Sequence, residues 1–208
     1  MDLESLFDRL LQAVDEQAYL TPSDHVEPAQ RRALDEIATA LRAPGFRAEQ
    51  VRSLIRRLYE RGQIDRVMLY SALHVVAAHP AVADWAEAAR LAGEQEQAAL
   101  ELGGPALQAN LASVERHRGV VAFLQGHHEV ALDYFSRAFE RQHSAENLGN
   151  VLCCLLALGE HDDAHDLYAR VRHSFPRDLV HALEARVQQD PDLALLRTAP
   201  SSNMEMPS

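Results

Sequence analysis

Histidine and cysteine are the residues of this chain whose chemistry can be tested first from their spacing. The 208 residues include 11 His and 2 Cys. His161 and His165 lie four residues apart, so on a helix they share one face, a spacing that zinc sites use. A closed zinc site takes four ligands, and no third and fourth ligand stand at suitable spacing. We therefore interpret both histidines as structural and predict no metal and no cofactor.

The sequence contains no complete motif of the common catalytic sites. His128-Glu129 matches the start of a zinc-protease motif, but Leu132 stands where its second His is required. The chain has no Gly-rich phosphate loop and no nucleophile elbow. Cys153 and Cys154 are adjacent in an apolar run, so on a helix they point about 100° apart, which suits neither a disulfide nor a shared metal. We predict no catalytic residue and no enzyme; the alternative is an enzyme whose His and Asp side chains converge from several helices.

Arginine supplies all 20 basic residues of the chain, and four of them gather on one expected helix. Arg52 and Arg56 share one flank of its apolar stripe, and Arg57 and Arg61 share the other. Two interpretations stay open, a secondary basic patch that docks an acidic partner and a solvated helix face, and we favour the second. The formal net charge of the whole chain is −11. Nonspecific binding to nucleic acid or to anionic membranes is therefore not expected.

The composition is that of a soluble globular protein of one or two domains, with 47% hydrophobic and 25% charged residues. The use of Arg without Lys, with frequent Ala and Leu, is typical of a G+C-rich genome, and we expect a bacterial source. The first residues lack the basic and apolar regions of a signal peptide. The longest apolar run, 151–158, is too short to span a bilayer. We expect a cytoplasmic protein without membrane insertion.

The apolar residues follow helical spacing along the chain, and no segment has the pattern of a strand. The expected helices of an N-terminal region, 1–78, cover residues 2–16, 28–43, 48–61 and 64–78. A closing helix is expected at 177–189, and residues 198–208 have the composition of a disordered tail. The sequence thus predicts an all-α fold.

A short pattern occurs twice at a distance of 33 residues. Each copy has Gly, then Ala five positions later, an aromatic residue after four more and a small apolar residue after another three. The two copies are Gly126, Ala131, Phe135 and Ala138, and Gly159, Ala164, Tyr168 and Val171. Gly93, Ala98 and Leu102 match a third copy less well. A helix-forming repeat of this length is typical of helix–turn–helix units that stack on their neighbours.

These motifs resemble the tetratricopeptide repeat (TPR) family, whose usual unit has 34 residues. The resemblance implies an α-solenoid of antiparallel helix pairs, with Gly in the turn and Ala where the helices of a pair touch. It extends over 79–189, with a degenerate repeat at 79–111, two clear repeats at 112–144 and 145–176, and a capping helix at 177–189. We expect Gly93, Gly126 and Gly159 to lie in successive turns between helices.

The resemblance also implies where a partner binds, because the first helix of each TPR lines the concave surface. Carried over to this chain, that groove is lined by seven residues: Arg116, Val120, Phe123, Leu124, Asn150, Cys153 and Leu156. It implies a non-catalytic adaptor that binds a peptide or helix of a partner protein. A chaperone similar to the type III secretion class, which cradles an unfolded client, is the closest alternative. Filling of the groove by the N-terminal helices and assembly as a homo-oligomer stay open.

Overall fold

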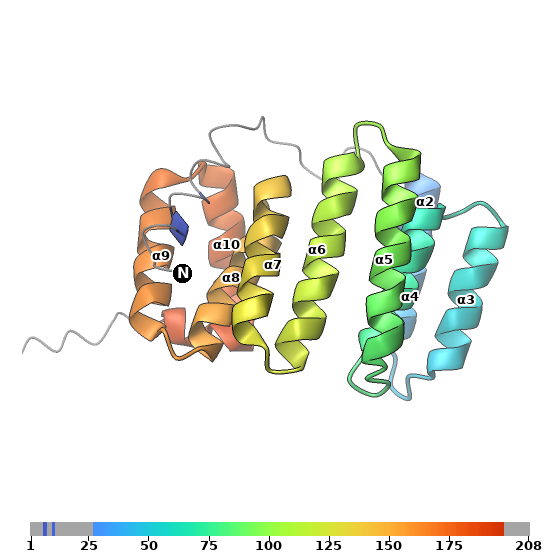
Figure 1. The fold of residues 1–208 in the computed structure, drawn as a ribbon, viewed down its shortest axis with the longest axis horizontal. Coiled ribbons are helices and arrows are strands. Elements are labelled where there is room, and N and C mark those ends of the chain that lie inside the picture. The colour runs from blue at the N-terminus through green and yellow to red at the C-terminus, as the bar shows by residue number, and fades with distance from the viewer. Residues whose placement is uncertain (1–5, 8–9, 11–26, 198–208) are drawn as a thin grey trace, which may run out of the picture.

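Helices are the only regular structure in the described part of the chain, which in this computed structural model comprises residues 6, 7, 10 and 27–197 (Figure 1). Most of the helix predicted at 2–16, and the tail predicted at 198–208, lie outside the described residues. The described helices are α2 (Pro28–Arg42), α3 (Ala48–Glu60), α4 (Arg66–Ala78), α5 (Trp85–Leu102), α6 (Leu107–Leu124), α7 (His128–Arg141), α8 (Ala145–Ala157), α9 (His161–Ser174), α10 (Arg177–Gln189) and the 3-10 helix η2 (Pro191–Arg197). Each packs against neighbours in the chain. None of these helices is long and apolar enough to cross a membrane.

Side-chain caps fix where several of the helices begin. Asp65 accepts a hydrogen bond from the Met68 backbone N–H at 2.8 Å, so α4 begins after it rather than at residue 64, where the sequence placed its start. Asp84 caps α5 in the same way. Ser144 accepts from the Asn147 N–H at 3.1 Å and starts α8. Each cap satisfies one of the amide donors that a helix N-terminus leaves free.

The two turns of the clear 33-residue pattern are where the sequence predicts them. Gly126 lies between α6 and α7 with φ +79°, and Gly159 lies between α8 and α9 with φ +83°. Both are in the left-handed region, which glycine adopts without steric cost and which other residues rarely adopt. Ala131 and Ala164, the small residues five positions later, are 0% exposed. Their predicted burial is confirmed.

The prediction for Gly93 is wrong, because this residue lies inside α5 rather than in a turn. The surrounding Ala, Leu, Glu and Gln residues favour helix, and one exposed glycine within a helix costs only about 1 kcal/mol. The chain turns ten residues later, at Gly103 and Gly104, with φ +59° and +74°. The degenerate repeat 79–111 therefore lacks the turn on which its assignment was based.

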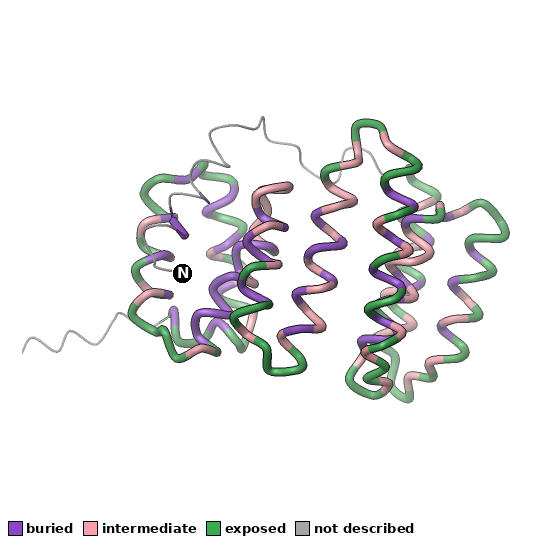
Figure 2. Tube along the Cα trace, in the orientation of Figure 1, coloured by how far each residue is buried: buried purple, intermediate pink, exposed green. Residues whose placement is uncertain are grey.

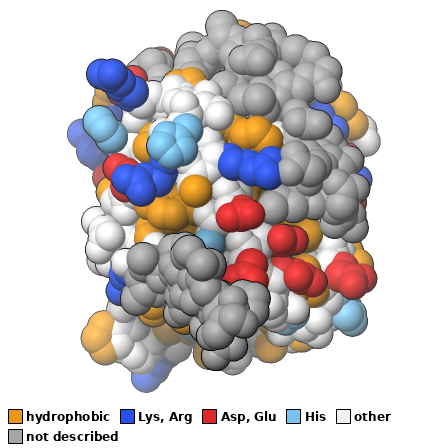
Figure 3. Space-filling model, turned by 90° about the vertical axis from the view of Figure 1, so that its left-hand side faces the viewer, with side chains coloured by type: hydrophobic (Ala, Val, Ile, Leu, Met, Phe, Trp, Pro, Cys, Tyr) orange, Lys and Arg blue, Asp and Glu red, His pale blue; other side chains and the backbone are white. Residues whose placement is uncertain are grey.

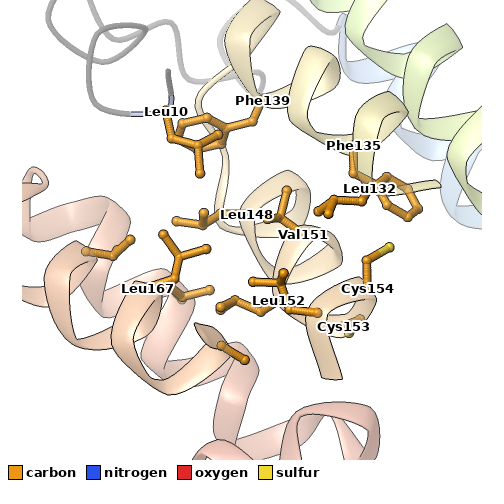
Figure 4. Close-up of a cluster of buried hydrophobic side chains, with 14 of the residues drawn as sticks. Leu10, Leu132, Phe135, Phe139, Leu148, Val151, Leu152, Cys153, Cys154 and Leu167 are labelled. Carbon is orange, nitrogen blue, oxygen red and sulfur yellow. The ribbon is translucent and has the colours of Figure 1, made fainter. Parts of the chain in front are cut away.

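Two large clusters of buried apolar residues lie at opposite ends of the row of helices (Figure 1). The N-terminal core joins α2, α3 and α4, with Ile37, Ile55 and Val76 among its buried members. The C-terminal core joins α6 to η2 and includes most of α8, as Figure 4 shows for its central residues and Figure 2 for burial along the chain.

Three residues near the start of the chain also belong to the C-terminal core. Leu6, Phe7 and Leu10 are helical and buried there, and the Phe7 ring lies 6.2 Å from that of Phe175. The sequence analysis grouped them with the N-terminal region 1–78. Their apolar spacing predicted burial but could not show which helices would bury them.

A group of buried polar side chains, the polar joint, lies where α4, α5 and α6 meet. It comprises His74, Gln95, Ser113 and His117. The histidine and glutamine side chains are buried, and small apolar clusters flank them on the same helices. The N-terminal and C-terminal cores are thus connected through this polar contact and through the two small apolar clusters beside it, rather than through one continuous apolar core.

Candidate interaction site

The four groove residues predicted on α6 share one face of that helix. Arg116, Val120, Phe123 and Leu124 follow helical spacing, and none of them is buried. Val120 and Phe123 rest on the C-terminal core, and the Phe123 ring lies 4.9 Å from the ring of His128. Leu124 is 45% exposed. We call Val120, Phe123 and Leu124 the α6 row.

The three groove residues predicted on α8 do not form an open surface. Cys153 and Leu156 are only 9% exposed and belong to the C-terminal core. The Asn150 side chain accepts a hydrogen bond at Oδ1 from Arg186 Nη2, at 2.7 Å. Whether the groove is open or filled was left open by the sequence, and at these three positions it is covered. The cover comes from α10 and η2, which pack on α8, whereas the sequence suggests the N-terminal helices.

Arg186 of α10 covers the surface of α8 around Asn150. Besides Asn150 it donates to the backbone oxygen of Glu146, and its Nε lies 3.4 Å from the Asp190 carboxylate. The guanidinium occupies space left by Gly149, where an added Cβ would come within 2.7 Å of it. Sequence reasoning missed Arg186. Gly149 was the available signal, because a glycine inside an apolar helix indicates a close approach by another group.

Arg116 and Glu146 connect α6 to α8 above the α6 row. Arg116 Nη1 donates to Glu146 Oε2 at 2.8 Å, and the two side chains are 22% and 61% exposed. An exposed pair of this kind stabilises a fold by less than about 1 kcal/mol.

The two cysteines are held in an unreactive form. Burial raises the pKa of the Cys153 thiol to about 11 and that of Cys154 to about 12. Since the thiolate is the nucleophile and the metal ligand, both side chains behave as small apolar residues at neutral pH.

The histidines of the sequence analysis lie at the surface of α9, His161 exposed and His165 half-buried. Within the described ranges, no group of three or more His, Cys, Asp and Glu residues lies close enough together to hold a metal ion.

The basic residues of α3 divide into two flanks with different surroundings. Arg52 pairs with Glu49 at 2.6 Å. The pKa of Glu87 on α5 is lowered chiefly by hydrogen bonds from Arg90, and further by the charges of Arg52 and Arg56. This flank is thus partly neutralised within the protein. Arg57 and Arg61, on the other flank, are exposed.

A shallow depression of about 360 Å³ lies between α9 and α10. Its charged lining includes Arg172, Arg177 and Glu184, and Arg172 Nε donates to Glu184 at 2.9 Å. Phe175 and Val180 line its apolar part. Figure 3 shows this end of the molecule, where basic and histidine side chains gather apart from a group of carboxylates. The internal ion pair neutralises two of these three charges, Arg172 and Glu184.

In comparisons with known proteins, the chain matched no protein-family model, and neither a curated protein nor a solved structure was found to match it.

Proposed function

We propose that the chain is a non-catalytic protein-interaction module, an α-solenoid of TPR type, and that the α6 row binds a segment of a partner protein. The adaptor role and the TPR assignment rest on the repeat pattern, and the location of the site rests on the partly exposed α6 row.

Helix boundaries support the repeat assignment. α7 and α9 each have 14 residues, and their first residues, His128 and His161, are 33 positions apart. α6 and α8 end at Leu124 and Ala157, again 33 positions apart. Two successive helix–turn–helix units therefore use the same turn and the same second helix, as expected of stacked repeats.

The accessibility of the α6 row is the single observation that locates the site. An apolar helix face that is left partly open, with Leu124 45% exposed at its end, suits the apolar side chains of a helix or extended segment. Phe123 is the aromatic member, and aromatic residues supply much of the binding energy at protein interfaces. The exposed Glu146 carboxylate, which pairs with Arg116 one helical turn before Val120, can accept a hydrogen bond from the partner.

Leu124→Ser is the sharpest test, because this side chain can be shortened without opening the core. Leu102→Ser is its matched control, since Leu102 is an exposed leucine, 58% accessible, at the end of α5. Partners captured from a cell lysate by the wild-type protein are identified by mass spectrometry, and the affinity of each is then measured by isothermal titration.

We expect Leu124→Ser to raise the dissociation constant at least about fivefold, which corresponds to a loss of about 1 kcal/mol of binding free energy. Leu102→Ser should leave it unchanged. Phe123→Ala should weaken binding further, with circular dichroism used to confirm that this variant is folded. If Leu124→Ser binds as tightly as the wild type while Arg57→Ala or Arg61→Ala loses binding, the partner docks on α3 and the α6 row is not the site.

A further inference from the structure

The two histidines of the polar joint stack face to face inside the protein. The His74 and His117 ring centroids are 4.2 Å apart, and the ring planes differ by 13°. The residues are only 1% and 6% exposed. His74 comes from α4 and His117 from α6, so this stack is a direct contact between a helix of the N-terminal core and a helix of the C-terminal core.

The hydrogen bonds of the polar joint place a proton on Nδ1 of both rings. His74 Nδ1 lies 2.9 Å from the Ala88 backbone oxygen, and His117 Nδ1 lies 2.8 Å from Gln95 Oε1. Both partners are acceptors, so each Nδ1 must donate. The Gln95 amide in turn donates to Ser113 Oγ at 3.2 Å. His74 Nε2 is buried without a hydrogen-bond partner.

The environment of both rings disfavours their charged forms. The pKa of His74 is lowered by burial, and that of His117 lies well below its ordinary value because of burial and then because of the charges of His74 and Arg116. Two imidazolium rings in a stack would also repel each other directly.

Charged groups on the surrounding helices are already paired with one another. α4 carries no carboxylate, and its Arg66 pairs with Glu101 of α5. The remaining carboxylates of α5 and α6 have arginine partners in the pairs Glu87–Arg90, Glu94–Arg90, Glu96–Arg118 and Glu115–Arg141. The last pair is the longest, at 3.9 Å, and Glu115 Oε2 is buried without a hydrogen-bond partner.

The helices that flank α4 and α6 contribute no other counter-charge. Asp65 and Asp84 cap α4 and α5, and Glu49 of α3 pairs with Arg52. α7 packs on a different face of α6, where Phe135 meets Gly119. Among these described side chains, none is placed to stabilise a protonated His74 or His117.

We propose that the His74–His117 stack is an acid-sensitive joint: on acidification, protons taken up by the two rings separate α6 from α4 and α5, while the two apolar cores stay folded. Only the polar joint and two small apolar clusters lie between the two cores, so a local opening can occur instead of complete unfolding.

The direction of the pH effect follows from proton linkage. In the opened state both rings have the ordinary histidine pKa of 6.5 and bind protons below that pH. In the closed state the pKa of each ring is lower, so the rings stay neutral at pH values just below 6.5. The closed joint is therefore fully stable above pH 6.5, and its stability is lost as the pH falls from 6.5 toward the lowered values. Each ring raises the opening constant up to about tenfold per pH unit, so the pair raises it up to about 100-fold.

Hydrogen exchange of the intact protein tests this joint directly. Protection of the amides in α4, α5 and α6 is measured at pH 7.5 and pH 5.5 by mass spectrometry, corrected for the intrinsic pH dependence of exchange, and compared with α8. In the wild type, the protection factors of the amides around the joint should be about 10-fold to 100-fold lower at pH 5.5 than at pH 7.5. Those of α8 should change much less. Equal loss in α8, or no loss at the joint, would overturn the proposal.

The double variant His74→Phe/His117→Phe keeps two aromatic rings and removes both titrating groups. Its protection at the joint should no longer depend on pH, whatever its absolute stability, since the readout is the change between two pH values. His143→Phe is the matched control, because burial also lowers the pKa of His143, which lies outside the joint. This control should retain the wild-type pH dependence. A double variant that retains it, or a control that loses it, would contradict the proposal.

Histidine NMR of the wild type provides a test that needs no variant. Two of the 11 imidazole rings should keep the chemical shifts of neutral histidine as long as the joint is closed. Their shifts should change to those of protonated histidine only when the joint opens. If all rings titrate in place with ordinary midpoints and α4 to α6 stay protected, the joint does not respond to acid.

Discussion

Gly149→Ala is expected to destabilise the protein even though it replaces glycine by the best helix former. The added methyl group would lie 2.7 Å from Cζ and Nε of Arg186. These atoms belong to a long, flexible side chain, so the expected response is displacement of Arg186 rather than distortion of α8. The displaced guanidinium would lose its bonds to Asn150 Oδ1, at 2.7 Å, and to the Glu146 carbonyl.

The size of the effect is a difference between two opposing terms. Hydrogen bonds made by charged groups contribute about 1.5–3 kcal/mol each when buried. The Arg186 side chain is 22% exposed, so we take about 2 kcal/mol for the set. Ala in place of Gly returns about 0.8–1 kcal/mol through helix propensity. The expected net loss for Gly149→Ala is therefore about 1 kcal/mol.

A double-mutant cycle with Arg186→Ala gives the sharper result, because the sign of the glycine substitution should reverse. Without the arginine side chain the methyl group has room, and Gly149→Ala should then stabilise the protein by about 1 kcal/mol. The coupling energy between the two positions is thus about 2 kcal/mol. Urea unfolding followed by circular dichroism measures all four proteins. Additive effects, or stabilisation by Gly149→Ala in the wild-type background, would show that Arg186 does not occupy the space beside Gly149.

Two further predictions concern the C-terminal core. Ala131→Leu or Ala164→Leu should each overpack a fully buried position and cost about 1–3 kcal/mol in urea unfolding, and unchanged midpoints in both would count against the close contact of paired helices. Cys153 and Cys154 should not react with a thiol reagent at pH 8 in the native protein, since burial raises their pKa to about 11 and about 12. Both should react at once in urea. Rapid reaction of the folded protein would show that these thiols are accessible.

Local features of the fold could be predicted because neighbouring residues determine them. Gly126 and Gly159 stand between apolar helices in a fixed pattern, and the structure places both in left-handed turns. The range predicted for the closing helix, 177–189, coincides with α10. Helix periodicity and turn residues act within a few positions of the chain, so one sequence is sufficient to recognise them.

Pairing between distant helices could not be predicted in this way. Asn150 and Cys153 have the spacing of exposed groove residues on α8, but Arg186, 36 residues beyond Asn150, covers the asparagine. Gly93 shows the opposite error, because a residue typical of turns stands in a segment whose other residues favour helix strongly. In both cases the result depends on a competition between contacts that spacing does not reveal.

α6 shows why a single helix can combine the features proposed above. Gly119 and Glu115 face α7, with the Phe135 ring against the glycine, and this contact joins α6 to the C-terminal core. His117 lies on another side and meets α4 and α5 through the polar joint. The α6 row lies between these two faces and rests on the C-terminal core rather than on the joint. Since the row and its supporting core are on the same side of the joint, opening the joint would leave the proposed binding surface attached to the helices that hold it in place.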